Sequence, residues 1–193
     1  TDDLFNEPLN YIDVVDFIVH PGYHPEPGVG HDIAIAVLAE PVLDVTPIER
    51  YRGSDEIGMR VDIASYGLPG IWPNPEPFDG LLRIYENRVD CFGCFAPVED
   101  NYMILDFGPV WSTPTLPRES VSTDVASGGL LINDQDQMVG FQNFVRGNFA
   151  ITGATRISDY NPWIDSIVVP EPSSFVILSV GAMFFAMFRR RLH

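Results

Sequence analysis

Two short segments of the sequence carry side chains of the kinds used in nucleophilic catalysis. Ser127 stands before Gly128 and Gly129, and glycines permit both a sharp backbone bend and the close approach of another molecule. Asp32 stands directly before the apolar run 33–38, where a partly buried carboxylate could be held against a histidine. A serine hydroxyl becomes nucleophilic when an imidazole takes its proton and a carboxylate holds that imidazole in one tautomer. The plainer alternatives are a serine at the entry of a hairpin and a turn carboxylate at a strand edge.

The histidines do not complete such a set within the sequence. His20, His24 and His31 all lie close to Asp32, and His193 stands at the end of the C-terminal tail. His20 precedes a proline and is expected in a surface turn. Because His31 is adjacent to Asp32, its ring cannot easily face that carboxylate and the serine together.

Cys91 and Cys94 form a lone C-x-x-C pair. No second cysteine pair and no nearby histidine completes a zinc site, so we expect a local disulfide, with a redox role as the alternative. The acidic stretches, such as Asp55-Glu56 and 134–136, are expected on a solvated face and lack the spacing of a calcium loop. We expect neither a metal nor a cofactor.

Length and charge limit the class of protein. A chain of 193 residues is of single-domain length with room for a sizeable core. With 11 Lys and Arg against 27 Asp and Glu, its net charge of −16 argues against nucleic acid or an anionic membrane surface as an electrostatic partner. A hydrophobic content of 46% is typical of folded globular proteins.

The spacing of apolar runs and turn residues predicts an all-β protein. Short apolar runs alternate with turns that contain most of the 16 Gly and 17 Pro. The expected strands are 14–19, 33–38, 59–66, 81–89, 102–107, 129–132, 138–145 and 150–157. A polar five-residue connection, 133–137, is expected to close a hairpin. The proline-rich stretch 69–77 is expected to be a loop and the boundary between two halves.

Several of these segments together resemble the trypsin-like serine proteases. The stretch 17–38, with His-Pro-Gly-Tyr at 20–23 and Asp-Ile-Ala at 32–34, looks like the segment around that family's catalytic aspartate. The Ser-Gly-Gly sequence at 127–129 resembles its nucleophile turn. Residues 61–67 match the family strand that ends in an aromatic-Gly pair, and residues 140–145 match the substrate-binding strand. Residues 153–164 match the closing strand and the start of the last helix. The segments follow the family order and cover most of residues 10–168.

This resemblance implies a trypsin-like double six-stranded β-barrel and cleavage of peptide bonds through an acyl-enzyme. Asp32 would orient the catalytic histidine, and Ser127 would attack the peptide carbonyl. The backbone N–H groups of Val125 and Ser127 would form the oxyanion hole. These roles follow from the match of motifs alone.

The resemblance also implies how substrate is bound. Val121 would lie at the floor of the specificity pocket, where an apolar residue favours uncharged side chains. The edge formed by Asn143, Phe144 and Val145 would pair with the backbone of a protein or peptide substrate.

The sequence departs from the family pattern in two places. The family histidine stands several dozen residues before the aspartate, in an Ala-Ala-His-Cys-like motif, whereas 31 residues precede Asp32. We therefore expect that residues 1–193 lack the first strands of an incomplete first barrel and the catalytic histidine. The family's Gly-Asp before the nucleophile is replaced by Val125-Ala126. Ala126 cannot form the ion pair that follows zymogen cleavage, and a β-branched Val125 suits a positive φ poorly.

The last 25 residues form a separate segment. Pro170-Glu171-Pro172 is followed by an uncharged run, 175–188, and by arginines at 189–191. As a hydrophobic helix the run would span about 21 Å, short of the ~30 Å hydrocarbon core, and snorkelling arginines extend its reach. An amphipathic or buried helix is disfavoured because no face of the run is polar. The three elements in this order resemble the PEP-CTERM signal of exported bacterial proteins.

This second resemblance implies a route to the cell envelope. An exosortase-type enzyme would recognise the signal and cleave near Pro170, Glu171 and Pro172 after export. The helix would anchor the chain in the inner membrane before sorting, with the arginines in the cytoplasm. The expected organisation is a trypsin-like domain at 1–168 and a sorting signal at 169–193. Two functions stay open: an exported serine endopeptidase, and a catalytically inactive relative that binds other molecules at the surface.

Overall fold

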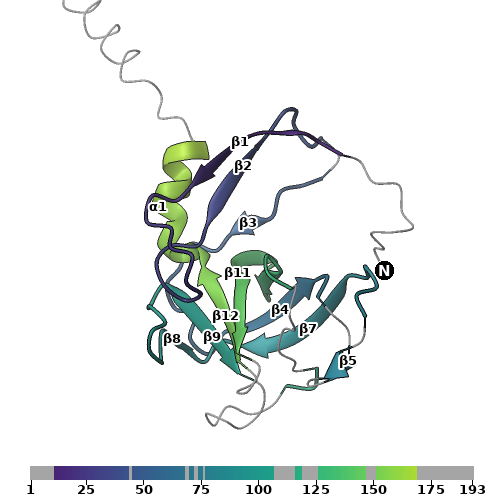
Figure 1. Ribbon diagram of the computed structural model, residues 1–193, viewed down its shortest axis with the longest axis vertical. Coiled ribbons are helices and arrows are strands. Elements are labelled where there is room, and N and C mark those ends of the chain that lie inside the picture. Colours follow the sequence, from purple (N-terminus) through teal and green to yellow (C-terminus); the bar gives the residue numbers. More distant parts are fainter. Residues whose placement is uncertain are drawn as a thin grey trace, which may run out of the picture. The chain divides into compact units, whose positions relative to one another are not determined.

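The computed structural model describes residues 11–43, 45–67, 70–71, 74–75, 77–106, 116–118, 126–146 and 151–168. These residues form strands and one helix (Figure 1). The elements are β1 (Val14–Val19), β2 (Ala34–Leu38), β3 (Glu49–Arg50), β4 (Arg60–Ser65), β5 (Gly70–Ile71), β6 (Asn74–Pro75), β7 (Arg83–Arg88), β8 (Cys91–Phe92), β9 (Tyr102–Asp106), β10 (Leu130–Asn133), β11 (Gln137–Arg146), β12 (Ile151–Arg156) and α1 (Ile157–Val168). The all-β prediction is confirmed, and every predicted strand appears with its ends within two residues of the expected ones.

The chain divides into two units, residues 1–159 and 160–193. All the strands belong to the first unit, and α1 begins there and continues into the second. The larger sheet of the first unit has the strand order β7-β4-β10-β11-β12-β9-β8, with β3 added parallel to β11. The neighbouring strands along this order are antiparallel.

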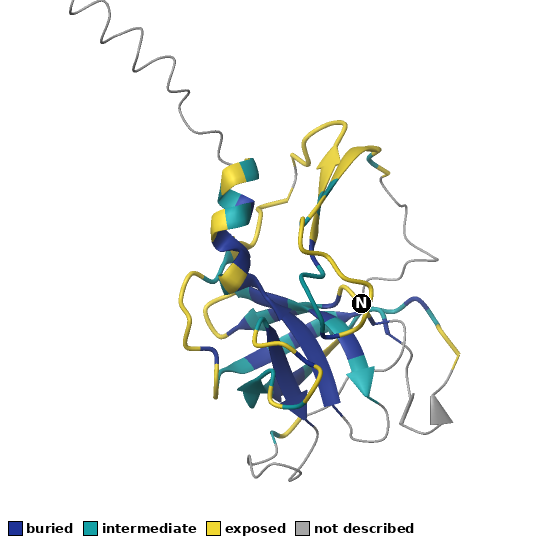
Figure 2. Cartoon of the chain, turned by 60° about the vertical axis from the view of Figure 1, so that its left-hand side comes forward, coloured by how far each residue is buried: buried dark blue, intermediate teal, exposed yellow. Residues whose placement is uncertain are grey.

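The sheet curls toward closure between β7 and β9. Asn87 of β7 donates a hydrogen bond from Nδ2 to the main-chain carbonyl of Asp106 in β9, at 2.9 Å. A curled antiparallel sheet encloses one face, and alternate residues of each strand point to that interior. On β4 the burial alternates in this way, with Val61 and Ile63 fully buried. The enclosed core consists of Val61, Ile63, Val89, Met103, Leu105, Leu131, Val139 and Ala154, and Figure 2 shows the buried strands in dark blue.

β1 and β2 form a separate two-stranded antiparallel sheet. Phe17 lies opposite Ala36, and Val19 lies opposite Ala34. The main-chain N–H of His20 donates to the carbonyl of Ile33 at 3.0 Å, which extends this ladder toward Asp32. Most of the hairpin is exposed, whereas Ile33 is buried.

The proline-rich stretch does not separate two halves of the chain, so that prediction is wrong. β4 and β7, which flank it, are antiparallel neighbours paired from Arg60–Arg88 to Ser65–Arg83. Within the stretch, β5 and β6 form a small ladder of their own. The stretch therefore connects two antiparallel strands of one sheet, and a connection between strands is an ordinary place for prolines in a sequence.

The connection between β10 and β11 is shorter than predicted. Asn133 ends one strand and Gln137 begins the next, so the turn contains three residues instead of five. The side-chain Oδ1 of Asn133 accepts hydrogen bonds from the N–H groups of Gln135 and Gln137, at 3.0 and 2.9 Å. Asp136 has a φ of 57°, which a short polar side chain tolerates best. The asparagine closes the turn and lets both strands extend by a residue.

The prediction of a solvated face at Asp55-Glu56 is wrong for Glu56. This side chain is completely buried. Its Oε2 lies 3.0 Å from Nη2 of Arg156, and the hydroxyl of Ser158 donates to its other oxygen. The guanidinium of Arg156 also lies 3.8 Å from the ring centroid of Phe92. A charged pair and an aromatic face therefore link the segment before β4 to the end of β12.

Candidate active site

The residues around Ser127 form a tight turn before β10. The N–H of Gly129 donates to the carbonyl of Ala126 at 3.0 Å, and Gly128 has a φ of 87°. That φ lies in the left-handed region, which glycine adopts without steric cost. The main chain of Gln142 in β11 accepts from Gly128 N–H at 2.8 Å and donates to the carbonyl of Gly129 at 2.7 Å. The turn is thus fixed against β11 on both sides of Gly128.

Ser127 itself is exposed, and its hydroxyl has a defined partner. The Oγ atom donates a hydrogen bond to the main-chain carbonyl of Asn143 at 3.0 Å. An exposed hydroxyl on a rigid turn is accessible to another molecule, as a nucleophile must be.

Asn143 also contacts the predicted carboxylate. Its side-chain Nδ2 donates to Oδ2 of Asp32 at 2.8 Å. Asn143 therefore binds Asp32 through its side chain and Ser127 through its main chain. The structure brings together two predicted site residues that are far apart in the sequence, and Asn143 is the residue that joins them.

Thr155 also contacts Asp32 and Asn143, and nothing in its local sequence indicated that it belongs to this site. Its Oγ1 donates to the main-chain carbonyl of Asp32 at 3.3 Å and accepts from Nδ2 of Asn143 at 3.3 Å. Thr155 is fully buried in β12. A threonine in a strand is common, so no local sequence signal distinguishes this one.

The loop before Asp32 is held by residues that follow the cysteine pair. Gly30 donates its N–H to Oε2 of Glu99 at 3.2 Å, and its carbonyl accepts from Nδ2 of Asn101 at 2.6 Å. The hydroxyl of Tyr102 donates to the carbonyl of Val29 at 3.4 Å. Burial is the main cause that raises the pKa of Tyr102 above its ordinary value, so this hydroxyl keeps its proton near neutral pH. These contacts fix the backbone two residues before Asp32.

Two histidines that precede Asp32 in the sequence stack on each other. The rings of His20 and His31 have centroids 4.4 Å apart and are tilted by 37°. Nδ1 of His20 accepts a hydrogen bond from the N–H of Gly22 at 3.1 Å, which requires that this nitrogen carries no proton. Burial, and secondly the charge of His31, lowers the pKa of His20 below its ordinary 6.5.

We expect acidification to loosen this turn. A lowered pKa means that the folded chain binds the proton of His20 less tightly than the unfolded chain does. The stability that neutral His20 contributes to the folded chain is complete above pH 6.5, and it declines as the pH falls from 6.5 toward the lowered pKa. Native-state hydrogen exchange at about pH 5 and about pH 7.5, corrected for intrinsic rates, should show faster opening of the Gly22 and His31 amides at the lower pH. A His20→Gln variant should lose most of that pH dependence, and equal dependence in both proteins would contradict this account.

The structure describes some of the other predicted site residues and not others. Val121, Val125 and the motif 170–172 lie outside the described residues. Phe144 is 9% exposed and packs in a cluster with Tyr102 and Ile104, whereas Val145 is half-buried. β10 pairs with β11 as far as Phe141, and β12 pairs with it as far as Arg146. Among the described strands, residues 144–146 therefore have a partner on one side only, and Asn143 lies at the bulge between Gln142 and Phe144.

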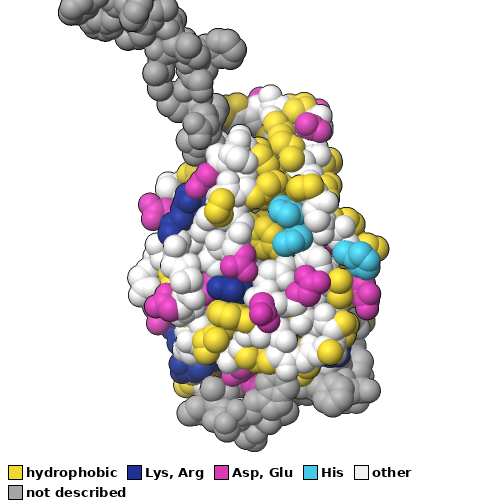
Figure 3. Space-filling model, turned by 90° about the vertical axis from the view of Figure 1, so that its left-hand side faces the viewer, with side chains coloured by type: hydrophobic (Ala, Val, Ile, Leu, Met, Phe, Trp, Pro, Cys, Tyr) yellow, Lys and Arg dark blue, Asp and Glu magenta, His cyan; other side chains and the backbone are white. Residues whose placement is uncertain are grey.

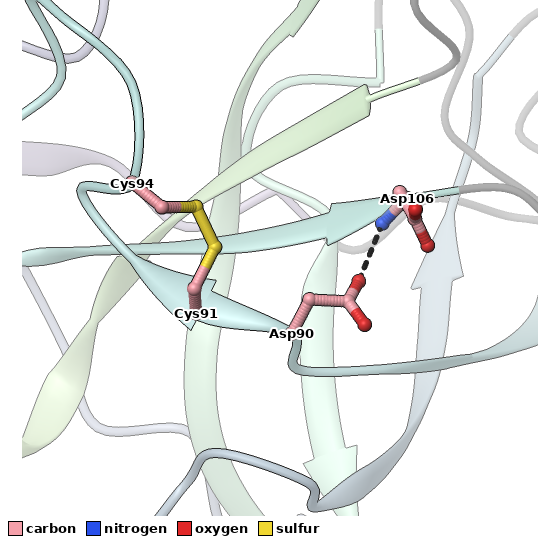
Figure 4. Close-up of a disulfide and its surroundings, with 4 residues drawn as sticks. All are labelled: Asp90, Cys91, Cys94 and Asp106. Carbon is pink, nitrogen blue, oxygen red and sulfur yellow. Dashed lines mark hydrogen bonds between the residues drawn. A yellow bond between two sulfur atoms is a disulfide. The ribbon is translucent and has the colours of Figure 1, made fainter. Parts of the chain in front are cut away.

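The predicted disulfide between Cys91 and Cys94 is confirmed (Figure 4). Cys91 lies in β8, opposite Ile104 of β9, so the bond is at the end of a short hairpin. The neighbouring Asp90 accepts the main-chain N–H of Asp106 at 2.9 Å, as the dashed line in Figure 4 marks. The connection of this hairpin, between β8 and β9, contains Glu99 and Asn101, which hold Gly30.

Among the described residues, no cluster of three or more His, Cys, Asp or Glu side chains could hold a metal ion. Within the same residues, no helix has the length and apolar character needed to cross a membrane. The predicted hydrophobic helix at 175–188 lies outside them.

Comparison with known proteins identifies two similarities. Residues 168–191 match the PEP-CTERM protein-sorting motif, which marks proteins for export and sorting to the cell envelope. Neuropsin, a serine protease expressed in the limbic system of mouse brain, has a similar structure with a TM-score of 0.64 and 21% sequence identity. The match covers 80% of this chain and 70% of neuropsin, so the chain has the trypsin-like fold. None of the curated proteins matches the chain.

Proposed function

We propose that the protein is an exported serine endopeptidase in which Ser127 is the nucleophile. The observation that carries this proposal is the double contact of Asn143, with the carboxylate of Asp32 and the hydroxyl of Ser127. Asp32 would orient a histidine that is supplied by polypeptide outside residues 1–193. The trypsin-like fold and the sorting motif support an exported, protease-like protein.

The chemistry follows from these groups. The histidine takes the proton of Ser127 Oγ, and the oxygen forms a bond with the carbonyl carbon of the substrate. The histidine then gives that proton to the leaving amine as the C–N bond breaks, which leaves an acyl-enzyme. A water molecule, deprotonated by the same histidine, hydrolyses this ester and restores Ser127. The backbone N–H groups of Ser127 and Val125 would stabilise the oxyanion.

Substrate would bind as an added strand. Residues 144–146 of β11 have one described strand neighbour, which leaves backbone groups on the other side for an extended peptide. The pocket floor would be Val121, which favours uncharged side chains. After export, an exosortase-type enzyme would cleave near residues 170–172, once the run 175–188 has anchored the chain with its arginines in the cytoplasm.

A fluorophosphonate probe tests the proposal on the complete gene product purified from the envelope of the cells that make it. We expect covalent labelling of Ser127 and its loss in Ser127→Ala. Ser166→Ala is a matched control, because Ser166 is also exposed and its hydroxyl also donates to a backbone carbonyl, that of Trp163 at 2.6 Å. If the natural protein is not labelled at Ser127, it is an inactive relative that binds other molecules instead.

A further inference from the structure

Arg146, the last residue of β11, holds a positive charge beside the strand edge at which a substrate would pair. Its side chain is held by an aromatic ring, because the guanidinium Cζ lies 4.7 Å from the ring centroid of Phe95. An arginine attracted to the face of a ring keeps its N–H donors at the rim of the guanidinium plane, where they can bind an acceptor. The residue is half-buried, so the charge is accessible and has a defined place.

Phe144 and Arg146 lie on the same face of β11. Side chains of a strand point alternately to its two faces, so residues two positions apart share a face. Phe144 belongs to the apolar cluster that contains Tyr102, and Phe95 packs against that same cluster. The contact of Arg146 with Phe95 agrees with this placement. Along this face, an apolar surface at Phe144 is therefore followed by a positive charge at Arg146.

None of the described carboxylates forms an ion pair with Arg146, although acidic residues are abundant. The chain has 27 Asp and Glu, and Figure 3 shows acidic side chains spread over one face with basic side chains among them. Glu99, four residues after Phe95, accepts the N–H of Gly30. Other arginines of the sheet and its loops do pair with carboxylates, namely Arg60, Arg83, Arg118 and Arg156. The guanidinium of Arg146 thus keeps its capacity to bind a carboxylate from another molecule.

We propose that Arg146 makes the protein select peptides with an acidic residue at the fourth position before the scissile bond. This inference rests on the proposed function, in which substrate is added as a strand. Ser127 Oγ lies 3.0 Å from the carbonyl oxygen of Asn143, so the residue whose carbonyl is attacked would lie opposite Asn143. Antiparallel pairing is the commoner and more stable arrangement. In that arrangement the second, third and fourth residues before the scissile bond lie opposite residues 144, 145 and 146.

Strand geometry brings the fourth residue to the guanidinium. Residues directly opposite in an antiparallel pair point to the same face, with Cβ atoms about 4.5–5.5 Å apart. A carboxylate opposite Arg146 can accept two parallel hydrogen bonds from it. The second residue would lie beside Phe144, which favours an apolar side chain, and the third would point to the other face. The net charge of −16 repels every acidic peptide, but this repulsion is equal for peptides of equal charge, whereas the contact depends on position.

Two isomeric peptides of equal charge test the proposal on the complete gene product. Both have an acetylated N-terminus and a fluorogenic coumarylamide as the leaving group. Their sequences are Glu-Ala-Val-Leu and Ala-Glu-Val-Leu, so glutamate is the fourth residue before the scissile bond in the first peptide and the third in the second. We expect kcat/KM to be about fivefold higher for the first peptide, as for a favourable, partly exposed ion pair. The difference should shrink as salt screens the charges.

Substitutions assign the preference to one side chain. Arg146→Gln should make kcat/KM equal for the two peptides. Arg146→Lys should keep part of the preference, because it retains the charge and loses the planar fork of donors. Arg52→Gln is the matched control: Arg52 is exposed next to β3, which pairs with the first residues of β11, and its removal changes the net charge equally. A preference that persists in Arg146→Gln, or that Arg52→Gln also abolishes, would overturn the inference.

Fluorophosphonate labelling separates a failure of this inference from a failure of the proposed function. If Ser127 is labelled and both peptides are cleaved equally, the acidic preference is wrong and the proposed catalysis stands. If Ser127 is not labelled, the proposed catalysis is wrong, and binding of the same two sequences, tagged with fluorescein through a diglycine spacer, is measured by fluorescence anisotropy. Tighter binding of the first sequence would then support the Arg146 contact in a binding protein, and equal or absent binding would overturn it.

Discussion

Asp32→Asn should slow the reaction of Ser127 with a fluorophosphonate by about 10⁴-fold in the complete gene product, the loss typical of an aspartate that orients a catalytic histidine. The variant keeps the shape of the side chain but removes its charge. The oxygen of the substituted amide can still accept the hydrogen bond that Asn143 Nδ2 donates to Asp32 at 2.8 Å. The fold around the site should therefore be preserved while the histidine loses its carboxylate partner. The measurement is the second-order labelling rate constant, together with the denaturation midpoint.

The matched control is Asp62→Asn. Asp62 is a strand carboxylate that lies 3.3 Å from Arg60 on β4 and does not contact Asn143. The Asp62→Asn variant should be labelled at Ser127 at a rate close to that of the natural protein. If Asp32→Asn labels as fast as the natural protein, Asp32 does not orient the base, and the catalytic role assigned to it is wrong.

Glu56→Ala should lower the free energy of unfolding by about 3–5 kcal/mol, because removing one partner of a buried pair leaves the other charge uncompensated. Glu56 is fully buried, and the side chain of Arg156 is 10% exposed. Asp159 lies 3.3 Å from the other end of the guanidinium and is 38% exposed, so it compensates only part of the charge. Urea unfolding should show a lower midpoint with little change in slope.

Two controls separate this effect from a general sensitivity to substitution. Glu40→Ala removes an exposed carboxylate and should change stability by no more than about 0.5 kcal/mol. Replacing Glu56 and Arg156 together by apolar residues of similar volume should cost clearly less than Glu56→Ala alone, since no unpaired charge stays buried. A loss below about 1 kcal/mol for Glu56→Ala would contradict the importance of this pair.

The sequence alone determined the strands, because each depends on local properties. Apolar residues that alternate or run together between glycines and prolines give the same signal wherever the strand lies in the sheet. Cys91 and Cys94 are three residues apart and belong to an exported protein, so their disulfide was also predictable. The chemistry of Ser127 and Asp32 was suggested by short motifs around each residue. The sorting motif was likewise readable from the order of its elements.

Only the tertiary structure decided which distant residues meet. Asn143 stands 111 residues after Asp32, and Arg156 stands 100 residues after Glu56. The residues next to Glu56 in the sequence are those expected around a solvent-exposed carboxylate. Its partner Arg156 lies at the end of β12, far along the chain, so the neighbouring sequence does not reveal the ion pair. The proline-rich stretch resembled a linker for the same reason, since pairing of β4 with β7 depends on contacts across it. Burial and partnership are properties of the folded sheet, and local sequence patterns do not encode which strands that sheet places side by side.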